Sequence, residues 1–370
     1  MIYVNVLNNR RKSYLNKVPP YWYPVYLNTR YLRDIGIKLR FFDDIREEIH
    51  DCDVLFLSSR YFHLEGKDPE GKQSVLEILS SFKDRLGKTV WFDMRDSTGN
   101  TQFEVLPYVN RYLKKQLLRD RRLYRNAFYG NRIYTHFFHE EFGIEDSYEE
   151  ENVPLPEEEE KKIGLSWNPG LLDYRGGGRF KKAFYLLGDR FEAKYSVGHW
   201  LPFRSYSKIH DVNLMALFST NYARETVKFQ RKKAIKILDQ LDDTTGIIYK
   251  EKLPLKKYLE MVSRARIVLS LFGWGELSSR DYQCFSAGSA LMMPDVSHLE
   301  TWPDLYIPKE TYWPVEWDLA NFEESYRYLL DNEALRQHIA RTGQEKYLKQ
   351  WSREGRRNFC ERLKLILSEL

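Results

Sequence analysis

The sequence of 370 residues has few cysteines, no repeated segment and no long hydrophobic run. Its three cysteines, Cys52, Cys284 and Cys360, lie far apart and share no metal-binding spacing, which argues against a disulfide framework and fits a reducing compartment. The longest nearly apolar stretch, residues 265–274, is shorter than the roughly 20 residues that cross a bilayer. Basic residues follow the apolar residues 1–7 instead of preceding them, so we expect no secretory signal.

Positive charge is concentrated in one segment. The chain has a net charge of +5, and residues 111–125 hold seven basic residues and one acid, so the remaining chain is close to neutral. Leucine and tyrosine interleave with these cations at near-helical spacing, which predicts an amphipathic helix. Such a helix suits anionic lipid, a lipid-linked pyrophosphate acceptor or nucleic acid. The alternative is a solvated helix that is packed by its leucines.

Strand-like and helix-like patterns alternate along the first half, which predicts βαβ units and a parallel sheet. The predicted strands are residues 2–7, 37–42, 54–57, 89–92 and 132–134, and the predicted helices are residues 25–35 and 75–82.

A composition break follows at residues 149–162, which contain seven glutamates and two prolines. This pattern is typical of a solvated linker. It divides the chain into an N-terminal domain (1–148), the linker (149–162) and a second α/β domain (163–350), with an amphipathic helix at 351–370.

The alternation restarts after this linker. Strands are predicted at residues 163–167, 212–218, 246–249, 267–272 and 290–293, and helices at residues 225–241, 255–264, 279–287, 322–330 and 334–349. We expect ligands at the carboxyl ends of these strands, in the crevice between the two domains.

The most informative stretch is residues 267–295, where a buried strand leads into Gly-Trp-Gly-Glu and then a helix. Ser278 and Ser279 stand where a helix N-cap belongs, and helix N-termini bind phosphate. Arg280 lies in the first helical turn, where it gains nothing from the helix dipole, so an anionic ligand explains it better than helix stability does. Gln283 lies one turn further on the same face, and Gly288 is placed to end the helix.

The run Ser279-Arg280-Asp281-Tyr282-Gln283, with Ala287-Gly288 and an apolar strand after it, resembles the donor-binding motif of glycosyltransferases of the GT-B fold. Exostosin-type and bacterial surface-polysaccharide enzymes carry such a motif, and the resemblance is strongest over residues 211–350. It implies an α/β fold of two Rossmann-like domains facing a central cleft, here with a C-terminal helical tail. The family's ribose-binding glutamate is Gln283 in this sequence, and Glu276 is a candidate for the missing carboxylate.

The resemblance also implies a basic residue after the first strand of the second domain, where it neutralises the donor phosphates. Arg224 is the first candidate for this role and Lys228 the second, because a guanidinium matches phosphate oxygens well. The expected donor-binding residues are therefore Arg224, Lys228, Glu276, Ser278, Ser279, Arg280 and Gln283.

The N-terminal domain is expected to supply the acceptor site and the base. Asp93 and Asp96 follow the strand at 89–92, and a carboxylate there can take the proton of an acceptor hydroxyl. Asp96 has a second interpretation as a helix N-cap, and His63 is an alternative base. Together with Glu276, Asp93 and Asp96 are the candidates for the chemical step.

Other motifs carry weaker signals. Residues 175–179 (Arg-Gly-Gly-Gly-Arg) look like a phosphate loop but lack its flanking strand and its Lys-Ser/Thr, and we interpret them as a loop. His136 and His139 have no third ligand nearby, so we expect no metal site. Several tryptophans are candidates for stacking on a base or a sugar, although most tryptophans serve packing: Trp200, Trp274, Trp302, Trp313 and Trp317.

These patterns and the resemblance predict a glycosyltransferase that moves a sugar from a nucleotide-sugar to a glycan hydroxyl, with bacterial surface polysaccharide as the expected product. The donor and a glycan or lipid-linked glycan are the expected partners, in the cytoplasm or at the inner face of its membrane. No cofactor is expected, because enzymes of this fold neutralise the phosphate with protein cations. Three alternatives stay open: a Kdo-type transferase with a CMP donor, an inactive sugar-binding protein, and a nucleic-acid-binding protein.

Overall fold

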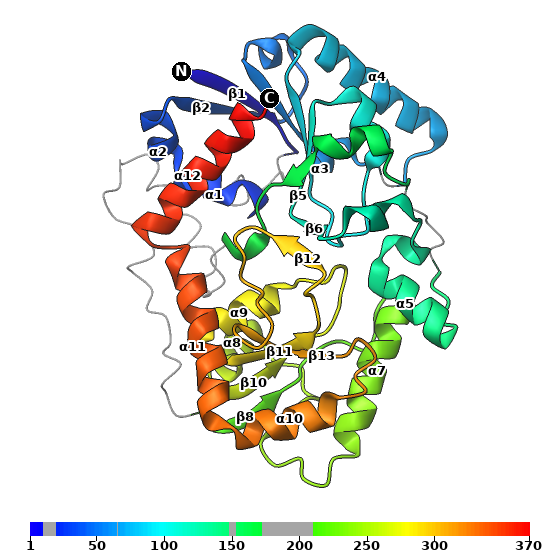
Figure 1. The fold of residues 1–370 in the computed structure, drawn as a ribbon, viewed down its shortest axis with the longest axis vertical. Coiled ribbons are helices and arrows are strands. Elements are labelled where there is room, and N and C mark those ends of the chain that lie inside the picture. The colour runs from blue at the N-terminus through cyan, green and yellow to red at the C-terminus, as the bar shows by residue number, and fades with distance from the viewer. Residues whose placement is uncertain (10–19, 65, 148–152, 172–209) are drawn as a thin grey trace.

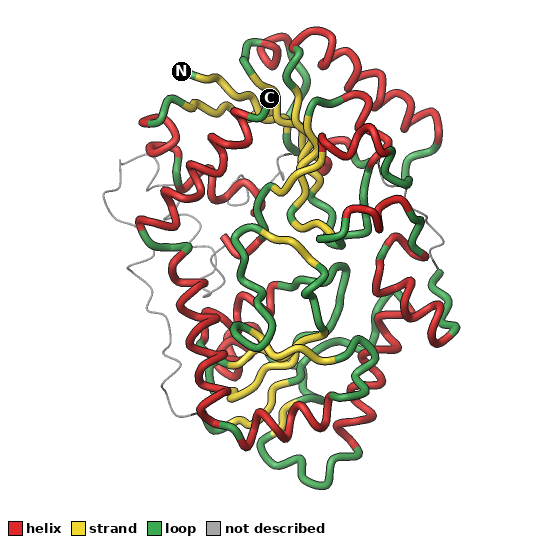
Figure 2. The backbone as a smooth tube through the Cα atoms, viewed as in Figure 1, coloured by secondary structure: helices red, strands yellow, loops and turns green. Residues whose placement is uncertain are grey.

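The computed structural model describes residues 1–9, 20–64, 66–147, 153–171 and 210–370. The chain forms two α/β halves stacked along the long axis of the molecule, each with a parallel sheet (Figure 1). Helices cover the sheets in both halves (Figure 2). The predicted α/β architecture of two Rossmann-like units is confirmed, and among the described helices none is both long and apolar enough to cross a membrane.

The first sheet has six parallel strands in the order β2-β1-β3-β4-β5-β7. They are β1 (Ile2–Leu7), β2 (Ile37–Phe42), β3 (Val54–Ser58), β4 (Thr89–Asp93), β5 (Arg111–Lys114) and β7 (Ile163–Leu165). Strands β3 and β4 are buried at every position, as expected for a parallel sheet that is covered on both faces. Helix α4 (Pro69–Leu86) packs on one face, and α1 (Tyr23–Leu27), α2 (Thr29–Asp34) and α12 (Arg353–Ser368) pack on the other.

The second sheet has five parallel strands in the order β13-β11-β10-β8-β9. They are β8 (Val212–Met215), β9 (Ile247–Ile248), β10 (Ala265–Leu269), β11 (Ala290–Pro294) and β13 (Tyr312–Val315). Its helices are α7 (Glu225–Asp239), α8 (Leu255–Val262), α9 (Ser279–Ala287), α10 (Phe322–Asp331) and α11 (Glu333–Lys349). The predicted bounds of α9 coincide with the observed ones, because its caps are local signals.

The division between the halves lies further along the chain than the sequence indicated. The strand predicted to open the second domain is present as β7, but it pairs with β5 in the first sheet. The acidic segment before it also packs on the first half, since the Leu155 amide donates to the Tyr124 carbonyl at 2.8 Å and Glu157 pairs with Arg125. Residues 153–165 therefore continue the first half, and α12 returns to it from the second.

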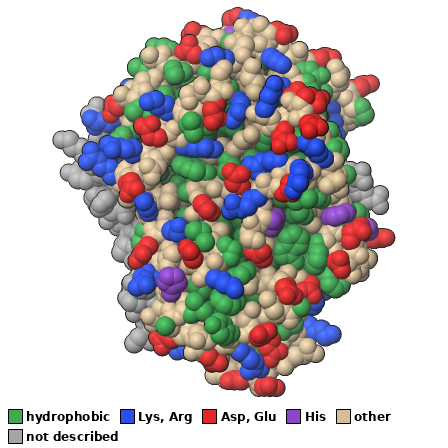
Figure 3. All heavy atoms as spheres, viewed as in Figure 1, with side chains coloured by type: hydrophobic (Ala, Val, Ile, Leu, Met, Phe, Trp, Pro, Cys, Tyr) green, Lys and Arg blue, Asp and Glu red, His purple; other side chains and the backbone are tan. Residues whose placement is uncertain are grey.

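The basic segment 111–125 is not a helix, which corrects the prediction from its spacing. It forms β5, then β6 (Gln116–Leu118), then a 3-10 turn at Arg121–Arg125. Five of its seven cations are paired with acids from elsewhere in the chain, including Lys114 with Asp93 and Arg121 with Glu300. On the face drawn in Figure 3, basic and acidic side chains of the described residues are interspersed.

The strand predicted at 132–134 is also absent, because these residues begin α5 (Ile133–Phe142).

Candidate active site

A cavity of about 490 Å³ lies between the two halves. From the first half it is lined by residues that follow β3 and β4, and from the second half by Arg224 and Trp274. The carboxyl ends of neighbouring parallel strands meet at one edge of a sheet, which is where ligands bind in such folds. The lining residues that carry charge or can titrate are Arg60, His63, Arg95, Asp96, Arg132 and Arg224.

The charge of this cavity is predominantly positive. Arg132 is only 4% exposed, and its guanidinium donates to the carbonyls of Trp274 at 3.0 Å and Gly130 at 2.9 Å. Arg95 donates to the Asn100 side chain and the Thr101 carbonyl. No ion pair among the described residues neutralises Arg60, Arg95 or Arg132. A cavity with three such cations suits an anionic ligand.

Asp96 is the carboxylate that lines this cavity, as the sequence placed it at the end of β4. Its side chain is 47% exposed, and the Lys115 ammonium donates to Oδ1 at 2.8 Å. Burial alone would raise the pKa of Asp96, but Lys115, together with Arg60 and Lys114, holds that pKa below its usual value. Asp96 is therefore an ionised carboxylate that a ligand can reach.

Asp93, the other candidate base, is fully buried and does not line the cavity. Its Oδ2 accepts hydrogen bonds from the Lys114 ammonium at 2.7 Å and the Tyr112 hydroxyl at 2.5 Å. Burial would raise the pKa of Asp93, but Lys114 holds it below the usual value. The residue joins β4 to β5, and no acceptor hydroxyl reaches it in this arrangement.

Glu276 is 2% exposed and contacts the first half. Its carboxylate accepts from the Ser97 hydroxyl at 2.9 Å, the Thr98 amide at 3.0 Å and the Gln116 side chain at 3.2 Å. The Glu276 carboxylate therefore contacts the loop after β4 and positions this loop, which carries Asp96. This placement does not fit the expected contact with a ribose or a reacting sugar.

Helix α9 begins as the sequence predicted. The Ser278 hydroxyl accepts from the Arg280 amide at 3.2 Å, Asp281 completes the capping box, and Gly288 ends the helix with a φ of 72°. Ser278 therefore acts as the N-cap, while Ser279 is exposed beside it. Gln283 is half-buried one turn further along the helix.

Arg280 is half-buried, and its Nε donates to the Tyr258 hydroxyl of α8 at 3.3 Å. The charge of Arg280 also acts on a second guanidinium, that of Arg231 on α7. Burial, and then the charge of Arg280, lower the pKa of Arg231 to about 10. These two cations stand near the first turn of α9, where the helix N-terminus adds partial positive charge.

Arg231 is the residue that the sequence interpretation missed. Its guanidinium donates to the carbonyls of Phe272 at 2.8 Å and Ser219 at 2.9 Å and lies 4.4 Å from the centre of the Tyr222 ring. Arg231 was visible as one of five cations within the predicted helix at residues 225–241. Its spacing of seven residues from Arg224 places both near one face of that helix, which was the available signal.

The other two predicted phosphate ligands differ in their surroundings. Arg224 lines the cavity, and its Nη1 lies 3.2 Å from Oδ2 of Asp146 in the first half. Lys228 forms an ion pair with Glu225 within α7 and does not line the cavity. Arg224 is thus brought to the cleft, and Lys228 is not.

The remaining motifs also differ in whether they line the cavity. Trp274 is 49% exposed and lines the cavity, 5.5 Å from the Tyr222 ring. His139 stacks on Tyr129, and the described residues contain no group of three or more His, Cys, Asp or Glu that could hold a metal. Trp200 and residues 175–179 lie outside the described residues.

In comparisons with known proteins, the second half of the chain matches a family model. Residues 180–361 match the model of a family described as glycosyl transferase-like. A comparison with curated proteins gives no match.

Solved structures similar to the chain include an alpha-glucosyltransferase in complex with UDP, for which no organism is named (10% identity, 99% of both chains, TM-score 0.44). They also include Anabaena HepE in complex with UDP-glucose (8% identity, 100% of both chains, TM-score 0.44). A third is the UDP-GlcNAc 2-epimerase from Neisseria meningitidis bound to UDP-GlcNAc (10% identity, 100% of both chains, TM-score 0.40).

The family match confirms the glycosyltransferase resemblance that the α9 motif indicated, although nothing in it is specific to exostosin-type enzymes. The two parallel sheets with a cavity between them form the GT-B architecture expected from that resemblance. Residues 180–361 therefore match a glycosyl transferase-like family model, within a chain of GT-B fold.

Proposed function

We propose that this protein transfers a sugar from a nucleotide-sugar donor to a hydroxyl group of a glycan or lipid-linked glycan. The observation that carries the proposal is the cleft cavity, in which arginines from both halves surround one accessible carboxylate, Asp96. A nucleotide-sugar has a diphosphate that needs cations, and its transfer to a hydroxyl needs a group that accepts a proton. The cavity contains both the cations and a carboxylate that can accept the proton.

The second half is proposed to bind the donor. Arg280 lies in the first turn of α9 with Arg231 near it, and Arg224 lines the cleft together with Arg132 of the first half. Guanidinium groups form paired hydrogen bonds with phosphate oxygens, and neutralisation of the leaving phosphate lowers the barrier to its departure. Trp274, exposed at the cavity wall, presents an aromatic face to the donor.

The first half is proposed to bind the acceptor and supply the base. As the acceptor oxygen forms its bond to the sugar's anomeric carbon, its proton passes to a carboxylate oxygen of Asp96. The bond between that carbon and the phosphate oxygen breaks, and its electron pair stays on the phosphate, next to the arginines. Protein cations meet the phosphate charge in this scheme, so no metal is proposed.

We propose no contact between residues 111–125 and a membrane. The expected contact between residues 111–125 and anionic lipid required a basic helix surface, and the cations of this segment instead pair within the protein. A glycan of a bacterial surface polysaccharide remains the proposed acceptor class, and the cytoplasm the proposed compartment.

The test uses the purified full chain with UDP-, GDP- and CMP-sugars, with and without glycan acceptors, and follows nucleotide release and sugar incorporation. We expect one donor class to support transfer in wild type, and at least tenfold slower transfer in Asp96→Asn. Asp304→Asn, which changes an exposed aspartate outside the cavity, is the matched control and should stay active. If no donor supports transfer or hydrolysis but a nucleotide binds, the inactive sugar-binding alternative replaces this proposal.

A further inference from the structure

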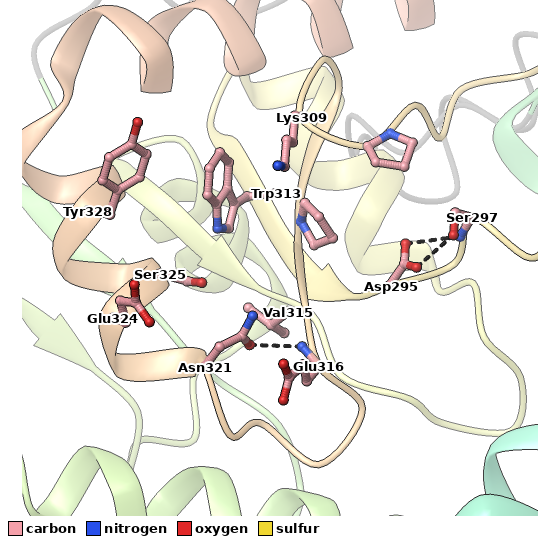
Figure 4. Close-up of a pocket in the computed structure, with 12 residues that line it drawn as sticks. Asp295, Ser297, Lys309, Trp313, Val315, Glu316, Asn321, Glu324, Ser325 and Tyr328 are labelled. Carbon is pink, nitrogen blue, oxygen red and sulfur yellow. Dashed lines mark hydrogen bonds between the residues drawn. The ribbon is translucent and has the colours of Figure 1, made fainter.

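A second cavity, of about 540 Å³, lies in the second half and shares no lining residue with the cleft. It is formed by β13, the start of α10 and the turn after β11 (Figure 4). We propose that this pocket binds a neutral saccharide, separately from the cleft where transfer is proposed. The choice of a saccharide rests on the proposed function, because a glycan acceptor has units beyond the one that reacts.

Two aromatic rings supply the first part of the argument. Trp313 of β13 and Tyr328 of α10 lie side by side in Figure 4, with ring centres 5.4 Å apart and planes inclined by 34°. Tyr328 is 48% exposed although it belongs to a packed helix. Sugar rings have an apolar C–H face, and an aromatic ring with one wet side is the protein surface that matches it.

Hydrogen-bonding groups surround these rings. Glu316 and Glu324 are exposed, and no ion pair among the described residues engages either carboxylate. Carboxylates without a cation partner accept hydrogen bonds from hydroxyl groups. A pocket with apolar walls and a few convergent polar groups is typical of a small-molecule site.

The charge of the pocket opposes an anionic ligand. Its lining contains three carboxylates, Asp295, Glu316 and Glu324, and one cation, Lys309. Asp295 is already held by Ser297 and Tyr312, and the Lys309 ammonium lies 5.8 Å from the centre of the Trp313 ring. This balance opposes a phosphate or a nucleic acid, whereas the arginine-rich cleft favours one. The two cavities are thus suited to different parts of the reactants.

Binding is tested by calorimetry on the full chain saturated with whichever of UDP, GDP, CDP and CMP binds it, so that the cleft is occupied. The probes are neutral trisaccharides of glucose, of galactose and of N-acetylglucosamine. We expect at least one to bind, and Tyr328→Ala or Glu324→Gln to weaken it at least tenfold, which corresponds to about 1.4 kcal/mol. Both side chains are exposed, so these variants keep the fold.

Two matched controls separate the pocket from the general surface. Glu323→Gln changes the adjacent carboxylate, which pairs with Arg327 outside the pocket, and Tyr3→Ala removes an exposed tyrosine on the first half. Both should bind as wild type does. The proposal is overturned if no probe binds at about 10 mM, if the cleft nucleotide displaces the probe, or if the pocket variants bind normally. The readout is binding, so a failure to detect sugar transfer leaves this result unaffected.

Discussion

Asp96 and Lys115 form an ion pair at the wall of the cleft, and the pair predicts the pH dependence of transfer. A base must be deprotonated, and the pKa of Asp96 lies below its usual value because Lys115, with Arg60 and Lys114, outweighs the effect of burial. Activity should therefore persist on the acidic side to a lower pH than an isolated aspartate allows. Lys115→Met removes the strongest of the opposing charges and leaves Arg60 and Lys114, so the pKa of Asp96 rises and the acidic limb of the kcat/KM profile moves to higher pH.

Lys162→Met is the matched control, because Lys162 pairs with Glu159 on the surface of the first half. Its profile should overlay that of wild type. An unchanged acidic limb in Lys115→Met would mean that a group other than Asp96, such as His63 in the same cavity, accepts the proton.

Arg280 gives a second prediction at the scale of one residue. Arg280→Ala should lower kcat at least about a hundredfold, by analogy with the loss of one charge-stabilising donor. The thermal midpoint should change little, since a half-buried first-turn arginine with one side-chain hydrogen bond contributes little stability. Arg264→Ala removes an exposed arginine that pairs with Asp211 and should remain active. Normal transfer in Arg280→Ala would remove α9 from the donor site.

At the scale of elements, the buried pair Asp93–Lys114 joins β4 to β5. Both side chains are fully buried, so Asp93→Asn leaves an ammonium without its counter-charge, which costs about 3–5 kcal/mol. The thermal midpoint should fall by roughly 6 °C or more. Asp93→Asn combined with Lys114→Met should recover part of the loss, because it removes both charges.

The same pair contributes to acid stability. The pKa of Asp93 in the folded protein lies below its unfolded value, because Lys114 outweighs the burial that would raise it. The stabilisation from ionised Asp93 is therefore complete above the unfolded pKa and is lost as the pH falls through the folded pKa. A midpoint in Asp93→Asn equal to that of wild type at neutral pH would contradict this account.

Elements with local signals were predictable from sequence, and those that depend on distant partners were not. Helix α9 was predicted because Ser278 and Gly288 mark its ends. Residues 111–125 have helical spacing, yet they form strands because Lys114 is buried against Asp93, a contact that spacing does not reveal. Strand β7 was found, but its sheet depends on its pairing with β5.

The same difference between local signals and distant contacts applies to the candidate site. The positions of Asp96 and Arg280 at the ends of predicted elements were correct, since strand ends and helix starts are visible in sequence. Glu276 was misjudged because its partners Ser97 and Thr98 lie 179 and 178 residues away in the chain. Such interdomain contacts require the three-dimensional arrangement.

At the scale of the whole molecule, Gly275 fixes how the halves meet. A Cβ atom at this position would lie 2.0 Å from the Asp96 carbonyl oxygen, so Gly275→Ala must push the two halves apart. We expect a lower thermal midpoint and slower transfer together, because the displaced loop carries Asp96. Gly273→Ala tests the same loop at a position where the Cβ meets only ordinary contacts at 3.4 and 3.5 Å, and it should behave as wild type.

Nucleotide binding is the last prediction at this scale. Cations from both halves line the cleft, so a nucleoside diphosphate that binds them should stabilise the folded chain without a metal. At a hundred times its Kd a ligand adds about 2.7 kcal/mol to the free energy of unfolding. Among UDP, GDP, CDP and CMP, we expect one to raise the thermal midpoint by the same amount in EDTA and in Mg²⁺. The rise should disappear in Arg280→Ala and remain in Arg264→Ala. Strict dependence of the rise on Mg²⁺ would mean that the arginines do not suffice to hold the phosphates, and the proposed division of roles in the cleft would fail.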